Sequence, residues 1–290
     1  MVYFKLLLTA FFWGGTFVAG RILRENVGSF SAAFLRFTVA AVLLLAIVRK
    51  SEGRFPQLTR AQWASIALLG LTGVFAYNAF FFKGLQVISA GRASLVIATS
   101  PVLIAVFSAW LYGEKLTVVK ITGILLSVTG AAVVISRGDL AGLLVQGVGR
   151  GELMIFGCVL SWVAYSLLGK SVMQVISPLT ATAYAAAAGM LLLAIPAWVE
   201  GLPADLPYYT GPEWVSIVYL GLFGTVIGFV WYYEGIRQIG PMRAGLFINF
   251  VPVSAILLAF FILSEPVTIS LIIGAGLVIS GVYLTNRPSG

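Results

Sequence analysis

The side chains of this sequence that could do chemistry are suited to binding rather than to catalysis. The chain contains no histidine and a single cysteine, Cys158, so the familiar zinc and haem ligand sets cannot be assembled from it. No Walker A pattern occurs, which argues against direct ATP hydrolysis. We therefore expect no cofactor and no metal. A membrane enzyme acting on lipid would usually need a histidine or paired acids, and this alternative is disfavoured.

Arg36 is the one basic residue that lies well inside an apolar run. A charge at such a depth is costly in a bilayer and is a functional hypothesis by default. Two interpretations stay open. The side chain could reach the membrane surface or pair with a backbone carbonyl, or it could bind the carboxylate of a substrate.

Aromatic and uncharged polar residues also fall inside apolar runs. Trp13 and Phe17 are four residues apart and therefore share a helix face, and the same spacing recurs later in the chain. Such rings could line a cavity for aromatic or bulky apolar molecules, whereas amides and hydroxyls could contact a zwitterion or only bond neighbouring helices. The residues that we expect in a substrate cavity are Trp13, Phe17, Tyr77, Asn78, Phe81, Thr99, Trp162, Tyr165 and Asn249, with Arg36 as a candidate carboxylate contact.

The elements that must position these residues are membrane helices. The sequence is 60% hydrophobic and 10% charged, whereas soluble domains carry about 25% charged residues. Lys and Arg fall mainly between apolar runs, so the net charge of +8 indicates membrane topology and a lipid bilayer as partner, not nucleic acid. A spanning helix needs about 20 mostly apolar residues. Ten runs qualify: 4–23, 31–48, 63–83, 91–112, 118–136, 151–170, 178–199, 214–234, 243–263 and 267–285.

The two halves of the chain repeat each other. A shift of 151 residues, without a gap, aligns 63–136 with 214–287 and gives 21 identities in 74 positions, including Trp, Pro, Glu and a series of Gly. Each half therefore holds five spans. Because five is odd, the second half must cross the membrane inverted relative to the first. The sequence predicts an all-α integral membrane protein of ten transmembrane helices, with repeats at 1–139 and 151–290 joined by a loop at 140–150.

The fourth and ninth runs are each broken by a proline, Pro101 and Pro252, at matching positions. Broken helices in corresponding places of two halves are typical of a transporter's midplane site. Each proline could be a tolerated kink or a hinge that shapes a cavity. Glu114 and Glu265 close the same two runs. We expect these acids to hold donors of loops or neighbouring helices at the two surfaces, with a gate role as the alternative.

The distribution of basic residues predicts an orientation. Placing the N-terminus inside puts more Lys and Arg in the inner loops than in the outer ones, and the predicted outer loop 200–213 contains acids without any base. This bias follows the positive-inside rule. We therefore place both termini in the cytoplasm and the protein in the cell (inner) membrane.

The opening AFFWGGTFVAGR, the FLRF of the second run and the endings GEKLT and SEPVT resemble the drug/metabolite transporter superfamily, and within it the EamA-type exporters, which include bacterial exporters of aromatic amino acids. The resemblance implies a basket of helices around a central cavity, lined chiefly by spans 1, 3, 4, 6, 8 and 9. It also implies a secondary transporter that exports small molecules, foremost amino acids including aromatic ones, by alternating access. Export of drugs or other metabolites is the alternative, and a passive channel is a third. The oligomeric state stays undetermined.

Overall fold

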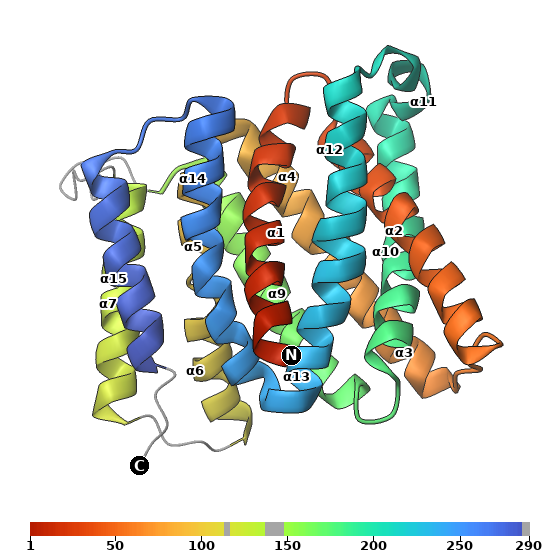
Figure 1. Ribbon diagram of the computed structural model, residues 1–290, viewed down its shortest axis with the longest axis horizontal. Helices are drawn as coiled ribbons and strands as arrows, with labels where there is room; N and C mark the ends of the chain where they lie inside the picture. Colours follow the sequence, from red (N-terminus) through yellow and green to blue (C-terminus); the bar gives the residue numbers. More distant parts are fainter. Residues whose placement is uncertain (113–116, 137–147, 286–290) are drawn as a thin grey trace.

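The structure, a computed structural model, describes residues 1–112, 117–136 and 148–285 (Figure 1). Glu114 and most of the predicted connecting loop 140–150 lie outside this part. Every regular element in the described residues is helical. Seven helical stretches are long and apolar enough to cross a membrane, and three shorter apolar helices accompany them at Val118–Val134, Phe247–Leu263 and Ile269–Leu284. The membrane-protein class is confirmed.

The elements begin and end as follows. In the first half they are α1 (Val2–Leu23), α2 (Ser29–Glu52), α3 (Arg60–Leu69), the π-helix η1 (Gly70–Ala76), α4 (Tyr77–Val87), α5 (Ala90–Ile97), α6 (Ser100–Tyr112) and α7 (Val118–Ile135). In the second half they are α9 (Arg150–Val172), α10 (Pro178–Glu200), α11 (Leu202–Asp205), the 3-10 helix η2 (Leu206–Tyr208), α12 (Gly211–Gly221), the π-helix η3 (Leu222–Ile227), α13 (Gly228–Gly245), the 3-10 helix η4 (Leu246–Phe250), α14 (Val251–Leu263) and α15 (Ile269–Thr285).

Both proline-broken runs are discontinuous in the structure. α5 ends at Ile97 and α6 begins at Ser100, so Pro101 is the second residue of a new helix. Pro252 is likewise the second residue of α14, after the 3-10 turn η4. Proline is tolerated in the first turn of a helix because no intrahelical acceptor is available there for its missing N–H. The predicted breaks are confirmed, and the hinge role stays a prediction.

A π-helical segment interrupts one long helix in each half. The shift of 151 residues carries η1 at 70–76 onto 221–227, which contains η3. The sequence pattern Gly-Leu-x-Gly occurs at the start of both segments, at 70–73 and at 221–224. At Gly73 a Cβ would lie 2.1 Å from the ring of Tyr165, so only glycine permits this approach of α9. π-helical segments shift the backbone hydrogen bonding locally and are frequent at functional sites.

α2 and α10 cap each other at both ends. Glu200, the last residue of α10, accepts hydrogen bonds from the backbone N–H and the hydroxyl of Ser31 near the start of α2. Glu52, the last residue of α2, accepts from the hydroxyls of Ser177 and Thr180 at the start of α10. A helix N-terminus stabilises a carboxylate because its N–H groups and dipole present positive charge. Because the end of each helix lies at the start of the other, α2 and α10 are antiparallel.

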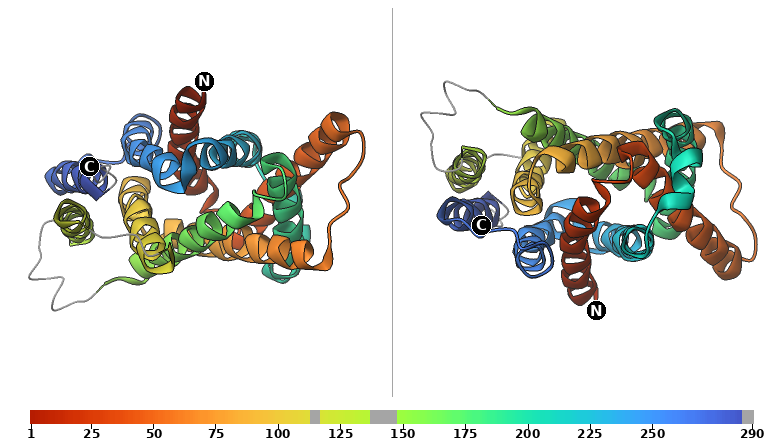
Figure 2. Two further views of the ribbon diagram at one scale, coloured as in Figure 1. Left: turned by 90° about the horizontal axis from the view of Figure 1, so that it is seen from below. Right: turned by 90° about the horizontal axis from the view of Figure 1, so that it is seen from above.

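Helices of the two halves pack against each other throughout the bundle. α1 packs on α14 and α4 on α9, while α7 and α15 lie side by side at one end of the long axis (Figures 1 and 2). At Gly281 a Cβ would lie 2.4 Å from the backbone of Ser127, so glycine allows close approach of α15 to α7. Small residues serve this purpose in membrane helix pairs generally. The largest buried cluster lies between α1, α2, α4, α9, α10 and α13.

Candidate functional site

A small cavity lies at the centre of the bundle, where residues from both halves meet. It has about 30 Å³ of free space, enough for a water molecule. This space is far smaller than the about 300 Å³ or more that small-molecule sites usually have. The lining residues are Trp13, Thr16, Phe17, Arg36, Tyr77, Ile97, Trp162, Phe229, Ile248 and Val251.

The walls of this cavity are aromatic. Trp162 lies edge-on to Trp13, with ring centroids 5.2 Å apart, and edge-on to Phe229 at 5.5 Å. Tyr77 contacts Trp162 at 5.5 Å. Such pairs contribute about 0.5–1.5 kcal/mol each beyond the area that they bury. The Trp13 indole also donates a 3.0 Å hydrogen bond to the carbonyl of Gly224, which fixes its ring.

Phe81 and Tyr165 support the cavity from behind and are not among its lining residues. Phe81 stacks on Tyr77 at 5.8 Å and contacts Phe17 at 5.1 Å. Tyr165 stacks on Tyr233 at 5.0 Å and lies 5.3 Å from Trp162. Four of the nine predicted cavity residues line the cavity directly: Trp13, Phe17, Tyr77 and Trp162. Phe81 and Tyr165 pack against these lining residues.

Arg36 forms the polar side of the cavity. Its side chain is 3% exposed, so the interpretation that it reaches the membrane surface is wrong. The guanidinium donates from Nε to the Thr225 hydroxyl at 2.8 Å, from Nη1 to Asn78 Oδ1 at 2.9 Å, and from Nη2 to the carbonyl of Gly224 at 3.4 Å. The last bond realises the predicted pairing with a carbonyl. The guanidinium carbon of Arg36 also lies over the ring of Phe229, 5.9 Å from the ring centroid.

The π-helix η3 supplies two partners of Arg36 directly, and η1 is linked to Arg36 through Asn78. Gly224 and Thr225 belong to η3. Asn78 is the second residue of α4, and its Nδ2 donates a 2.7 Å hydrogen bond to the carbonyl of Val74 inside η1. A single guanidinium thus joins one π-helix of each half. The predicted contact residue Asn78 meets Arg36 instead of the cavity.

The cation at this site has only neutral partners. Ion pairs within the described residues include those of Lys5 with Glu234, Arg21 with Glu265, Arg24 with Glu25 and Arg92 with Glu152. Arg36 is in none of them. A guanidinium carries five N–H donors, and three of those of Arg36 have an acceptor among the described residues.

Two further predicted residues lie outside the cavity lining. The hydroxyl of Thr99 donates to the carbonyl of Val96 one turn earlier, in the break between α5 and α6. Asn249 lies in η4 and is 7% exposed. Its Oδ1 is buried without a hydrogen-bond partner among the described residues. Asn249 follows the lining residue Ile248 in the sequence, but it is not itself a lining residue.

Sequence reasoning missed Thr225 and Phe229. The repeat held a usable signal for both: Thr225 aligns with Val74 and Phe229 with Asn78 under the shift of 151 residues, so both positions break the symmetry of the two halves. Broken symmetry at or shortly after the repeated Gly-Leu-x-Gly pattern could have marked them as candidates.

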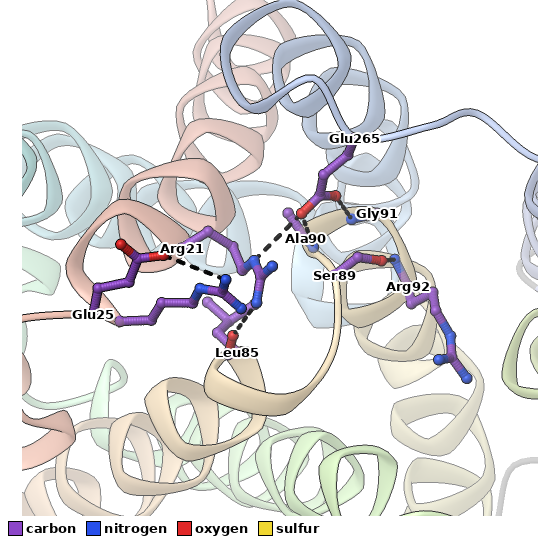
Figure 3. Close-up of polar contacts among 9 residues, drawn as sticks. Arg21, Glu25, Leu85, Ser89, Ala90, Gly91, Arg92 and Glu265 are labelled. Carbon is purple, nitrogen blue, oxygen red and sulfur yellow. Dashed lines mark hydrogen bonds and ion pairs between the residues drawn. The ribbon is translucent and has the colours of Figure 1, made fainter.

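Glu265 holds three elements together at one end of the bundle (Figure 3). It accepts hydrogen bonds from the backbone N–H groups of Ala90, at 3.1 Å, and Gly91, at 3.4 Å, at the start of α5. It also pairs with Arg21 of α1 at 3.4 Å, and Arg21 in turn donates to the carbonyl of Leu85. The prediction that Glu265 holds donors of a neighbouring helix is confirmed.

A larger cavity of about 320 Å³ lies beside Glu265, lined by the α4–α5 and α14–α15 connections and the adjoining helix ends. It has no aromatic side chain in its lining, in contrast to the central cavity. Among the residues that the structure describes, no group of three or more Cys, Asp or Glu side chains could hold a metal ion. The central cavity is therefore the candidate functional site.

Apolar helices of spanning length make this a membrane protein, and comparison with known proteins shows which family it belongs to. The chain belongs to the EamA-like transporter family, whose model matches residues 1–136 and 149–287. A crystal structure with 22% sequence identity superposes with a TM-score of 0.70 over 98% of this chain and 96% of the other chain, so the fold is shared over the whole length.

Two relatives illustrate the range of named functions in the family. The uncharacterized transporter YyaM of Bacillus subtilis (strain 168) is 30% identical over 98% of this chain and 93% of the relative. A protein of Streptantibioticus cattleyicolor named "Probable terminal-alkyne amino-acid exporter" is 32% identical over 97% of this chain and 92% of the relative. Both are named as transporters.

Proposed function

We propose that this protein is a secondary transporter that exports small metabolites, foremost amino acids including aromatic ones, through its central cavity. The observation that carries the proposal is Arg36, a buried cation that has no carboxylate partner among the described residues and that borders a cavity with aromatic walls. A carboxylate would complete the guanidinium with strong, charge-assisted hydrogen bonds. The rings of Trp13, Tyr77 and Trp162 would then receive an aromatic or other apolar side chain.

The similarity to a protein named as an amino-acid exporter supports this choice of substrate. It also supports net export as the direction of transport. Residues that could complete the substrate contacts once the helices separate are Phe17 in the lining, and Asn249, whose Oδ1 is a buried acceptor without a partner among the described residues. Asn78 would act through Arg36, and Phe81, Thr99 and Tyr165 would act through the shape of the walls.

Alternating access is the mechanism that we propose. The architecture behind it is ten spanning helices as two inverted repeats, 1–139 and 151–290, joined by 140–150. The paired π-helices and the reciprocal caps of α2 and α10 support this arrangement. The breaks at Pro101 and Pro252 would act as hinges. The contacts of Glu265 would close one end of the pathway, and Glu114 would do the same at the other.

Transport by purified protein in proteoliposomes tests this proposal. We expect saturable uptake of labelled phenylalanine or tryptophan that is accelerated by the same amino acid inside the vesicle, a counterflow that a passive channel cannot produce. Arg36→Leu should reduce transport at least tenfold, whereas Arg54→Leu, at an exposed position between α2 and α3, should leave it unchanged. Movement of an unrelated solute without movement of any aromatic amino acid would overturn the proposal.

A further inference from the structure

Among the described residues, the central cavity is lined by one positive charge, that of Arg36, and by no negative charge. Of the ten acidic residues in the sequence, Glu114 and Asp139 lie outside the described part. Seven of the other eight lie in connections or in the first or last turn of a helix. The eighth, Glu234, is in α13 and pairs at 2.7 Å with Lys5 in the first turn of α1. None of the eight lines the cavity.

This charge imbalance should decide which ligand binds best. Arg36 is buried among neutral partners, and a buried charge without a counter-ion is destabilising in a low-dielectric surrounding. A ligand carboxylate supplies the counter-ion. A ligand ammonium meets the opposite situation, because it would lose its hydration, find no carboxylate in the described lining and lie close to a second cation.

Two features of the cavity could nevertheless hold an ammonium group. Aromatic faces attract cations, and the rings of Trp13, Tyr77 and Trp162 line the cavity, but such a face carries no net negative charge and cannot neutralise an ammonium next to Arg36. The buried Oδ1 of Asn249 has no hydrogen-bond partner among the described residues, yet it is uncharged and outside the lining. Neither feature balances the charge of an ammonium as Arg36 balances that of a carboxylate.

We infer that the cavity selects aromatic carboxylates of net negative charge: the carboxylate of the ligand is required, and its amino group is dispensable. This inference rests on the proposed function, since it takes the central cavity as the substrate site. It adds a substrate class, the aromatic carboxylic acids without an amino group, which the protein should bind at least as tightly as the matching amino acids.

Three ligands with one phenyl-ethyl skeleton test the inference. At pH 7, 3-phenylpropionate is an anion, phenylalanine is a zwitterion and phenethylamine is a cation. Their binding to the full chain in lipid nanodiscs can be measured by isothermal titration calorimetry. We expect 3-phenylpropionate to bind at least as tightly as phenylalanine and phenethylamine to bind at least tenfold more weakly than either. Arg36→Gln should weaken the binding of 3-phenylpropionate at least tenfold, and Arg54→Gln should not change it.

The order of the three affinities in the unaltered protein decides the question even where Arg36→Gln does not fold. Phenylalanine binding at least tenfold more tightly than 3-phenylpropionate would overturn the inference and leave the proposed function standing. If phenethylamine binds as tightly as 3-phenylpropionate and the protein also binds phenylalanine in a separate titration, the inference is likewise overturned and the proposed function stands. Binding of none of the three, by protein that binds another solute, would instead overturn the proposed function and with it the inference.

Discussion

At the scale of the residue, the site depends on how one guanidinium is held. Thr225 accepts from Arg36 Nε at 2.8 Å and donates to the carbonyl of Leu220 at 3.0 Å, so its hydroxyl bridges the cation and the backbone before η3. Asn78 bridges Arg36 and the carbonyl of Val74 in the same way. The two bridges set the direction of the remaining N–H groups of Arg36. We therefore regard Thr225 as a positioning residue.

Replacing Thr225 by Val should leave a buried charged donor without its acceptor. Such a loss costs about 1–3 kcal/mol. We expect a lower midpoint of thermal unfolding and, in the same variant, weaker binding of 3-phenylpropionate with less effect on phenethylamine. Thr225→Ser should restore both properties because it keeps the hydroxyl.

The control for this experiment is Thr72→Val, the same change at a hydroxyl that donates to Leu68 within its own helix. It should change neither the thermal midpoint nor the affinity. A loss of stability in Thr225→Val that spares the preference for carboxylates would contradict the positioning role.

At the scale of the element, carboxylates at the C-terminal ends of helices accept hydrogen bonds from the N-terminal ends of other helices. Glu52 and Glu200 do so between α2 and α10, and Glu265, just after α14, does so for α5. The end of its own helix is an unfavourable place for an acid, whereas the N-terminus of a neighbour is a favourable one. Each such acid therefore stabilises a pair of helices from different halves. In this way the caps fix which helices are neighbours.

Glu265→Gln should weaken the contact between α14, α1 and α5. The pair with Arg21 has side chains that are 16% and 15% exposed, so solvent screens it less than a surface pair. We expect a loss of about 1 kcal/mol or more, seen as a lower midpoint of thermal unfolding in nanodiscs. The matched control is Glu25→Gln, because Glu25 is 71% exposed in its pair with Arg24 and such pairs contribute little. Equal midpoints for the two variants would contradict the role given to Glu265.

At the scale of the whole molecule, the proposed inversion of the halves makes a claim about topology. The predicted orientation puts the α2–α3 connection in the cytoplasm and the α10–α12 connection outside. Arg54 and Tyr208 are exposed in these two connections. Cys158, the single cysteine of the sequence, is buried against the carbonyl of Tyr77 and can be replaced by Ala to give a background without thiols.

Single cysteines at these two positions should react from opposite sides. In intact cells, a maleimide that cannot cross the membrane should label the Tyr208→Cys variant and should label the Arg54→Cys variant only after the cells are permeabilised. Labelling of both from the same side would contradict the inverted arrangement. The opposite pattern would keep the inversion but reverse the predicted orientation.

The sequence by itself determined the membrane class, the positions of the apolar runs, the duplication and the breaks at Pro101 and Pro252. The apolar runs and the breaks are local features of the sequence, and lipid explains the runs because a span must satisfy its backbone groups within a helix. The duplication is seen by comparing two stretches of the same sequence. The sequence also identified Arg36, since a charge in an apolar run is visible without any structure.

Only the tertiary structure decided what Arg36 contacts. Its partners Thr225 and Gly224 lie 189 and 188 residues further along the chain, and no spacing rule relates such distant positions. The same holds for Phe229, which a helix of the second half brings to the cavity, whereas Thr99 bonds locally. The physical reason is that a helix face is fixed by sequence period, but its neighbour is fixed by packing, here by glycines and carboxylate caps that join one half to the other.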